Sequence, residues 1–187
     1  MIRGMRIAVI AANGRLGKTF VEEALAAGHT VHGGIRGKDT LSAHSNLKVM
    51  ACDATQPDDL RQLLQGQDVV VSAIGHVKGS PPDVQTVATK AVVGIMNELG
   101  ISRFVDVTGT GVRFPGDIIT PVDRLLNVAV TIIDPNRVND GRNHQEVLKQ
   151  SSVDWTTIRL LKLQDVSPRP YSCFFMVRRS GMLAGRK

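Results

Sequence analysis

The stretch that decides the fold is Ala11-Ala12-Asn13-Gly14-Arg15-Leu16-Gly17, which lies between the apolar run Met5–Ile10 and the helix-like run Lys18–Ala27. Its two glycines occupy the second and third positions of the glycine pattern that follows the first strand of a dinucleotide-binding unit, and Ala11 stands at the first position. A turn with few Cβ atoms lets a pyrophosphate approach the free N–H groups at the start of the next helix, where the helix dipole favours negative charge. The stretch therefore fits a phosphate-binding turn, although an ordinary strand-to-helix turn would use the same residues.

Short apolar runs with the length of buried strands recur along the chain, at Ile7–Ile10, Val31–Ile35, Leu47–Cys52, Val69–Ile74, Phe104–Val107 and Trp155–Leu160. Helical patterns lie between them, with apolar residues three or four positions apart at 16–25 and 84–99. Gly28 and Gly100 follow these patterns, where glycine caps are expected. A shorter helix is predicted over Pro57–Leu64, with proline and acids in its first turn. The alternation predicts an α/β fold with a parallel, doubly wound sheet and helices on both faces.

Composition narrows the class of protein. The chain has 187 residues, of which 42% are hydrophobic, enough for one sizeable core. No apolar run reaches membrane-spanning length and the first residues lack the apolar core of a signal peptide, so we expect a cytoplasmic location and no membrane partner. Cys52 and Cys173 have no neighbouring Cys or His cluster, and we expect neither a disulfide framework nor a metal site.

Charge is compatible with an anionic ligand. The formal net charge is +6, and aromatic residues make up 4% of the chain, which leaves little for base stacking. We therefore expect a small-molecule partner and no nucleic acid. The sequence leaves the oligomeric state and the identity of the substrate open.

A succession of motifs carries a family resemblance: Met5–Gly17, Arg36 after the second strand, Cys52-Asp53 after the third, Val70–Gly75 at the end of the fourth, and Asp154–Arg159. Together they resemble the atypical short-chain dehydrogenase/reductases, most closely the NAD(P)H-binding, NmrA-like group that includes flavin reductase/biliverdin-IXβ reductase. The resemblance covers roughly residues 5 to 165. It implies one NAD(P)-binding Rossmann domain over 1–187, with a cofactor half at 5–112 and a substrate-side segment with an abbreviated C-terminus at 113–187.

The resemblance also implies a set of cofactor-binding residues. The pyrophosphate would lie on the turn that follows Ala11, formed by Asn13, Gly14, Arg15, Leu16 and Gly17. Asp53 and Ala54 would lie beside the adenine, and Ala73, Ile74 and Gly75 would line the ribose side. Their positions at successive strand ends favour a site, because ligands of open α/β sheets bind there. Asp53 could instead be an ordinary turn residue, and Ala73 and Gly75 could simply mark the end of a strand.

Arg36 bears on which nicotinamide cofactor is used. A site for NAD typically has an acid after the second strand, whereas the 2′-phosphate of NADP requires positive charge there. This chain has Arg36 and Lys38, with the nearest acid at Asp39. We therefore predict NADPH as the preferred cofactor, with NADH possible, and Arg15 as a second residue within reach of the phosphate. If Arg36 and Lys38 are instead ordinary solvated residues of the loop, the sequence indicates no preference between NADPH and NADH.

Catalytic residues are harder to assign. The single tyrosine, Tyr171, has Phe175 four positions later, so the Tyr-x-x-x-Lys dyad of the main short-chain dehydrogenase branch is excluded. In flavin reductase-like members a hydroxyl after the fifth strand orients the reactants. The resemblance points to Thr108 and Thr110 for this role, although either could cap its own turn.

Two further residues are substrate-side candidates. His76 follows the fourth strand and Lys162 follows the sixth, and each could instead be an exposed loop residue. Arg124, Arg137 and Arg142 could face an acidic substrate or solvent.

Two functions follow from these observations. The first is an NAD(P)H-dependent oxidoreductase that transfers hydride to a flavin, a quinone or a similar planar acceptor. The alternative is a non-catalytic, NmrA-like sensor that binds the dinucleotide and acts through a protein partner. The missing dyad is compatible with both.

Overall fold

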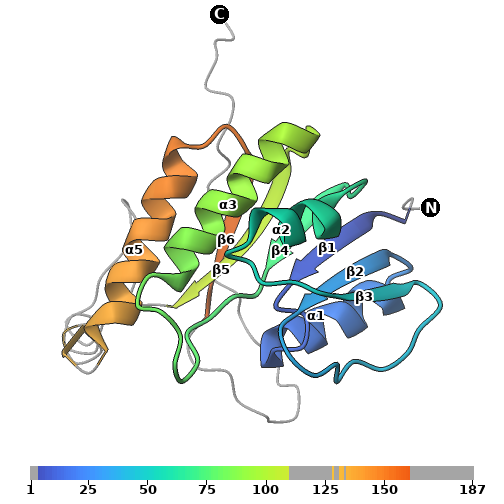
Figure 1. The fold of residues 1–187 in the computed structure, drawn as a ribbon, viewed down its shortest axis with the longest axis horizontal. Coiled ribbons are helices and arrows are strands. Elements are labelled where there is room, and N and C mark those ends of the chain that lie inside the picture. Colours follow the sequence, from blue (N-terminus) through green and yellow to red (C-terminus); the bar gives the residue numbers. More distant parts are fainter. Residues whose placement is uncertain (1–3, 110–127, 129–130, 133, 161–187) are drawn as a thin grey trace, which may run out of the picture.

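The computed structural model of the chain describes residues 4–109, 128, 131–132 and 134–160. Six strands and four helices are formed within these ranges. In chain order they are β1 (Arg6–Ile10), α1 (Arg15–Ala26), β2 (Thr30–Ile35), β3 (Leu47–Ala51), α2 (Pro57–Leu64), β4 (Val69–Ser72), α3 (Val84–Leu99), β5 (Arg103–Gly109), α5 (Pro135–Gln150) and β6 (Asp154–Leu160) (Figure 1).

The strands form one sheet in the order β3-β2-β1-β4-β5-β6, and every pair is parallel. The chain builds outward from β1 to β3, then returns to the other side of β1 with β4. This order is that of the Rossmann fold, in which ligands bind where the direction of strand addition reverses. The predicted fold class is confirmed, and the reversal lies between β1 and β4.

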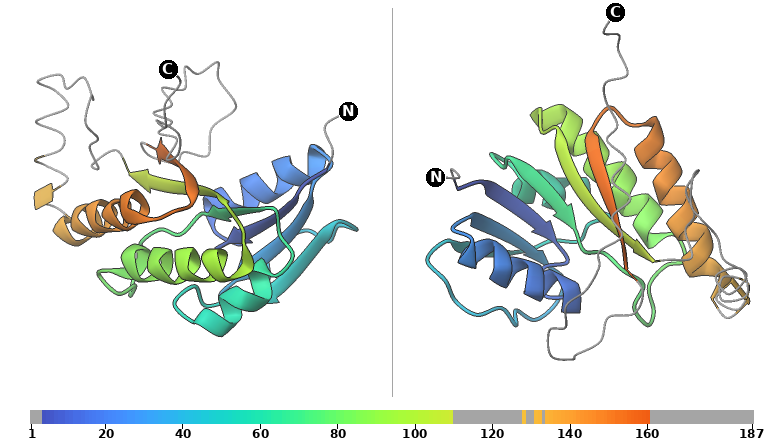
Figure 2. Two further views of the ribbon diagram at one scale, coloured as in Figure 1. Left: turned by 90° about the horizontal axis from the view of Figure 1, so that it is seen from above. Right: turned by 180° about the vertical axis from the view of Figure 1, so that it is seen from behind.

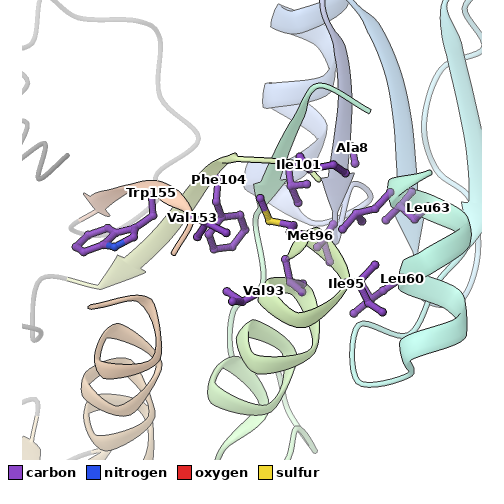
Figure 3. Packing of buried hydrophobic residues seen from close by; sticks show 14 of the residues in the cluster. Ala8, Leu60, Leu63, Val93, Ile95, Met96, Ile101, Phe104, Val153 and Trp155 are labelled. Carbon is purple, nitrogen blue, oxygen red and sulfur yellow. The ribbon is translucent and has the colours of Figure 1, made fainter. Parts of the chain in front are cut away.

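Helices cover both faces of the sheet. Figure 2 shows α1 on one face, with α2, α3 and α5 on the other. Successive side chains of β1 alternate between two hydrophobic clusters, because neighbouring strand residues point to opposite faces. Ile7 and Val9 belong to the cluster that includes Val21 of α1. Ala8 and Ile10 belong to the cluster on the face of α2 and α3, part of which Figure 3 shows.

The ends of the elements follow local sequence signals. Gly100 caps α3 with φ +69°, and Gly28, two residues after α1, has φ +82°. Both glycines therefore adopt the left-handed conformation expected at helix ends. Helix α5 begins at Pro135, where the Asp134 carboxylate accepts a hydrogen bond from the backbone N–H of Arg137. An acidic N-cap followed by proline is a favourable helix start.

No described helix combines the length and apolar character needed to cross a membrane. Most of the predicted substrate-side segment at 113–187 lies outside the described residues.

Candidate cofactor-binding site

A cavity of about 530 Å³ lies outside the carboxyl ends of the strands, at the reversal between β1 and β4. Fourteen of the candidate site residues named from the sequence line it: Ala11, Asn13, Gly14, Arg15, Leu16, Arg36, Asp53, Ala54, Ala73, Ile74, Gly75, His76, Thr108 and Arg137. Gly17 is not one of the lining residues. Thr110 and Lys162 lie outside the described residues. The fold therefore brings together side chains from strand ends that are far apart in the sequence.

Ala11 keeps the conformation that the first glycine of the pattern requires. Its φ is +59°, the one positive φ of a non-glycine residue among the described residues. The left-handed region costs an alanine roughly 1 kcal/mol relative to glycine. Two backbone hydrogen bonds hold the turn, from Gly14 N–H to the Ala11 carbonyl at 3.0 Å and from Ala12 N–H to the Gly34 carbonyl at 3.0 Å. The alanine therefore leaves the shape of the turn intact.

Gly14 and Gly17 contribute to the turn in different ways. A Cβ atom on Gly17 would lie 2.2 Å from the Ala11 carbonyl oxygen and 2.9 Å from two backbone atoms of Ala12. A Cβ atom on Gly14 would meet a single neighbour, the Ala11 carbonyl oxygen, at 3.2 Å. Gly17 therefore lets α1 pack closely against the turn, as expected of the third glycine of the pattern. Gly14 faces the cavity.

The N-terminus of α1 differs from those of the other described helices. Asp58 and Asp59 lie in the first turn of α2, and Asp134 caps α5. The Asp140 carboxylate accepts from the backbone N–H groups of Gln85 and Thr86 at the start of α3. Helix α1 has neither an acid in its first turn nor a side-chain cap. Since the first N–H groups of a helix lack intrahelical partners, this end is the one suited to an anionic ligand.

Asn13 joins the glycine turn to the loop that carries Arg36. Its side-chain amide donates to the carbonyl oxygens of Arg36 at 3.3 Å and of Lys38 at 3.2 Å. This pair of bonds fixes the backbone of the loop beside the turn. The exposed Arg36 side chain is thereby placed at the edge of the cavity.

Asp53 is both a turn residue and a cavity residue. Its Oδ1 accepts from the backbone N–H of Thr55 at 2.9 Å and from the Thr55 hydroxyl at 2.7 Å. These two bonds, together with the nearby charge of Arg36, lower the pKa of the Asp53 carboxyl. Oδ2 has no hydrogen-bond partner among the described residues. The carboxylate is therefore held by its own turn with one oxygen left for a ligand.

The Thr108 hydroxyl is buried, and no described residue forms a hydrogen bond with it. Thr108 lies near the end of β5 and is 4% exposed. Its Oγ1 makes no hydrogen bond within the part of the chain that the structure describes. An unpaired buried hydroxyl costs roughly 1–3 kcal/mol. Because Thr108 lines the cavity, a ligand with a polar group at this end could satisfy it.

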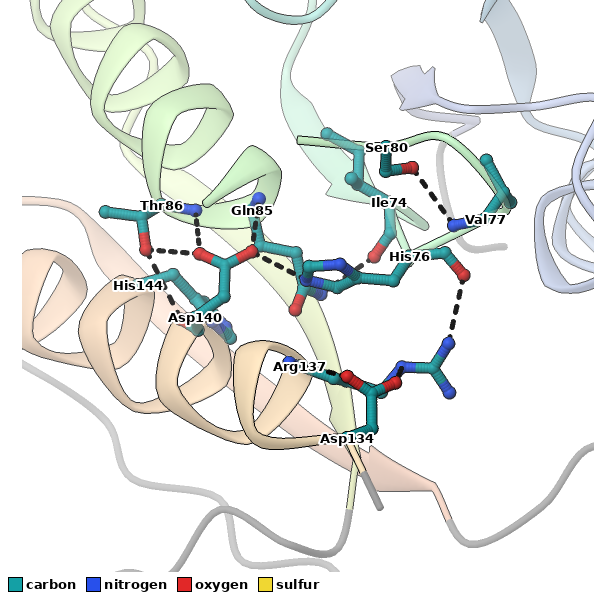
Figure 4. A network of polar contacts seen from close by, with 10 residues as sticks. All are labelled: Ile74, His76, Val77, Ser80, Gln85, Thr86, Asp134, Arg137, Asp140 and His144. Atoms are coloured by element: carbon teal, nitrogen blue, oxygen red, sulfur yellow. Dashed lines mark hydrogen bonds and ion pairs between the residues drawn. The ribbon is translucent and has the colours of Figure 1, made fainter. Parts of the chain in front are cut away.

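A buried carboxylate that sequence reasoning missed holds one wall of the cavity (Figure 4). Asp140 of α5 is 1% exposed and its Oδ2 lies 2.8 Å from Nε2 of His76. One turn before Asp140 in the same helix, Arg137 lines the cavity and donates to the His76 carbonyl at 3.2 Å. His76 is thus held by α5 on two sides and is no exposed loop residue, since its side chain is 10% exposed. Arg142, by contrast, is exposed.

Cys52 also lines the cavity but is unsuited to nucleophilic chemistry. Burial, with smaller contributions from the charges of Asp59 and Asp53, raises the pKa of its thiol to about 12. The reactive form of cysteine is the thiolate, so this thiol stays protonated near neutral pH. Among the described residues, no group of three or more His, Cys, Asp or Glu side chains could hold a metal ion.

The sequence matches one family of known proteins and a few individual relatives. The sequence model of the NAD(P)H-binding family matches residues 11–177. An uncharacterized chloroplastic protein of Arabidopsis thaliana is 26% identical over 172 residues, which are 84% of this chain and 59% of that protein. The chain thus spans less than two thirds of the length of this relative.

Solved structures share the fold. A short-chain dehydrogenase/reductase of Veillonella parvula in complex with NADP superposes with a TM-score of 0.67 at 17% identity, over 83% of this chain and 68% of that one. The enzyme WbmH of Bordetella bronchiseptica in complex with NAD+ gives a TM-score of 0.65 at 20% identity, over 85% and 57% of the two chains. At these identities the similarity shows the fold alone. Since the family model covers most of the sequence, the chain belongs to the NAD(P)H-binding family.

Proposed function

We propose that the protein is an NADPH-dependent reductase of the NmrA-like group that transfers hydride to a planar acceptor, a flavin or a quinone. The observation that carries this proposal is one cavity with two polar groups along its lining that form no hydrogen bond with a side chain of the described residues. The N-terminus of α1 lacks an acidic or side-chain cap, and the buried Thr108 hydroxyl lacks a partner among the described residues. NADPH has an anionic pyrophosphate and a polar nicotinamide amide that suit these two groups.

The remaining lining residues fit the other parts of the cofactor. The N–H groups that follow Gly14 would hold the pyrophosphate, and Arg36 would pair with the 2′-phosphate. Asp53 would accept hydrogen bonds at the adenosine end through its unpaired Oδ2. The Thr108 hydroxyl would orient the nicotinamide end. When bound, the cofactor supplies the hydride.

The chain itself contributes positioning and exclusion of water. Ile74, Val107 and Leu160 give the cavity an apolar lining. Apolar walls suit the flat face of a flavin or quinone and strengthen polar contacts by excluding water. Holding a hydride donor against an acceptor in a reactive geometry can by itself supply several kcal/mol of rate enhancement. The chain therefore does not require the Tyr-x-x-x-Lys dyad for a reaction of this kind.

A binding titration followed by a turnover assay tests the proposal. Purified protein is titrated with NADPH and with NADH, and nicotinamide absorbance is then followed with FMN or menadione as acceptor. We expect tighter binding of NADPH and a loss of absorbance that depends on the enzyme. The variant Thr108→Val keeps the shape of the side chain and removes the hydroxyl, so its rate should be lower. Tight binding without turnover of any acceptor would contradict the reductase and favour a redox sensor.

A further inference from the structure

His76 lies in the loop after β4 and presents an imidazole to the cavity. Its Nε2 lies 2.8 Å from Oδ2 of Asp140 (Figure 4). Because an ionised carboxylate can accept but not donate, Nε2 carries the hydrogen of this bond. Nδ1 has no hydrogen-bond partner among the described residues. It is also not fully buried, since the fully buried polar atoms without a partner do not include it. The second ring nitrogen is therefore accessible.

Asp140 is held too firmly to release the ring. Its carboxylate accepts four hydrogen bonds, from His76, from the backbone N–H of Gln85, and from both the N–H and the hydroxyl of Thr86. Two of these donors are N–H groups in the first turn of α3, so moving the carboxylate would uncap that helix. A carboxylate fixed in this way sets the orientation and the tautomer of the imidazole, as in catalytic pairs of Asp and His.

We propose that His76, oriented by Asp140, is the proton donor of the reductase when the acceptor is a quinone. This inference rests on the proposed function. Transfer of hydride to a quinone delivers two electrons and one hydrogen, which leaves the hydroquinone monoanion. Nδ1 of the protonated His76 ring donates a proton to the anionic oxygen, and the ring takes a proton from water. The sum is NADPH, quinone and H+ giving NADP+ and hydroquinone.

The surroundings of the ring support this assignment. Arg137 of α5 contacts His76 through the backbone carbonyl of the latter and is itself paired with Asp134 at 3.3 Å. Lys78, in the same loop as His76, is exposed. His144 contacts the Asp140 carbonyl from within α5 and is bonded to Asp106 at 2.8 Å. From α3, the uncharged Gln85 donates its backbone N–H to the same Asp140 oxygen that His76 contacts. Among the described residues, Asp140 is the carboxylate that contacts the ring.

The variant His76→Gln tests the assignment because its amide can still donate to Asp140 but cannot release a proton. The matched control is His44→Gln, since His44 is exposed and does not line the cavity. For each protein we would measure the melting temperature, the Kd of NADPH, and kcat with menadione between pH 5 and 9. A general acid of this kind contributes about 100-fold or more to the rate.

We expect His76→Gln to keep the melting temperature and the Kd of NADPH, with kcat about 100-fold lower. In the wild type, kcat should fall as the pH rises and the ring loses its proton, whereas the profile of the variant should lack this fall. Asp140→Asn should move the pH at which kcat falls, which a loss of stability alone would not do. The control should behave as the wild type.

Two results separate failure of this inference from failure of the proposed function. If the wild type turns over menadione and His76→Gln keeps both its kcat and its pH profile, His76 is not the proton donor while the reductase stands. If the wild type binds NADPH without reducing menadione or FMN, the reductase fails and the proton donor fails with it.

Discussion

Replacing Gly14 with alanine should weaken NADPH binding while leaving the fold almost unchanged. Gly14 has φ −70° and ψ 165°, which alanine adopts without strain. The new methyl group would lie 3.2 Å from the Ala11 carbonyl oxygen, so that neighbour has to move by a few tenths of an ångström. Loss of the conformational freedom of glycine in the unfolded chain offsets this cost by about 0.4–1 kcal/mol. The change in unfolding free energy should therefore stay within about 1 kcal/mol.

The same methyl group would occupy the space through which, in the proposed binding mode, the pyrophosphate approaches the N–H groups of α1. We expect the Kd of NADPH to rise at least about 10-fold, a loss of about 1.4 kcal/mol. Gly17→Ala should show the opposite pattern, because its Cβ would lie 2.2 Å from a backbone oxygen. Overpacking of this kind costs roughly 1–3 kcal/mol, or about 2–12 °C in melting temperature for a domain of this size.

Calorimetric melting and fluorescence titration with NADPH would measure both effects. Gly94→Ala is the matched control, since Gly94 lies within α3 and a Cβ atom there would meet nothing within 4 Å. It should bind NADPH as the wild type does. If Gly14→Ala binds NADPH with the wild-type Kd, the pyrophosphate does not lie on this turn. If Gly17→Ala has the melting temperature of the wild type, the close packing of α1 on the turn is not needed for stability.

Three further perturbations address the cofactor preference, the turn and the buried histidine. Arg36→Asp should raise the Kd of NADPH by about 10-fold or more and move the preference toward NADH in parallel titrations; an unchanged ratio would place the 2′-phosphate elsewhere. Ala11→Gly should relieve the strain of the left-handed conformation, although the greater flexibility of glycine in the unfolded chain offsets part of the gain. In denaturant unfolding, the free energy of unfolding should rise by up to about 1 kcal/mol, and a clear loss of stability would contradict the strain at Ala11. For His144, burial acts to lower the pKa but the hydrogen bond and charge of Asp106 raise it overall. The stabilising contribution of His144 should therefore be complete below the ordinary histidine pKa of about 6.5 and be lost as the pH rises through the raised pKa of the folded state. The difference in unfolding free energy between the wild type and Asp106→Asn should shrink accordingly with rising pH.

The sheet was predictable because the strands of a parallel sheet are buried on both faces and appear as short apolar runs. The run Val31–Ile35, for example, differs from the observed β2 by one residue. The predicted glycine cap of the second long helix is also confirmed, because Gly100 follows α3 in the left-handed conformation. The strand order gave the place of the cavity, and with it the loops that line it.

Helix α5 shows why part of the site could not be predicted. Its buried positions include Asp140, His144 and Gln145, which are satisfied by hydrogen bonds to other elements. The apolar periodicity of this helix is therefore weak. It could not predict where the helix starts or that the Asp140 side chain is buried. The signal that could have located its start was Asp134-Pro135, an acidic N-cap followed by proline.

A crystal structure of the protein with NADP+ bound would test the central claim most directly. The account predicts the pyrophosphate at the N-terminus of α1 beside Gly14, the 2′-phosphate against Arg36, and the nicotinamide amide within hydrogen-bond distance of the Thr108 hydroxyl. A cofactor bound away from the cavity, or one whose pyrophosphate does not contact the backbone after Gly14, would contradict it.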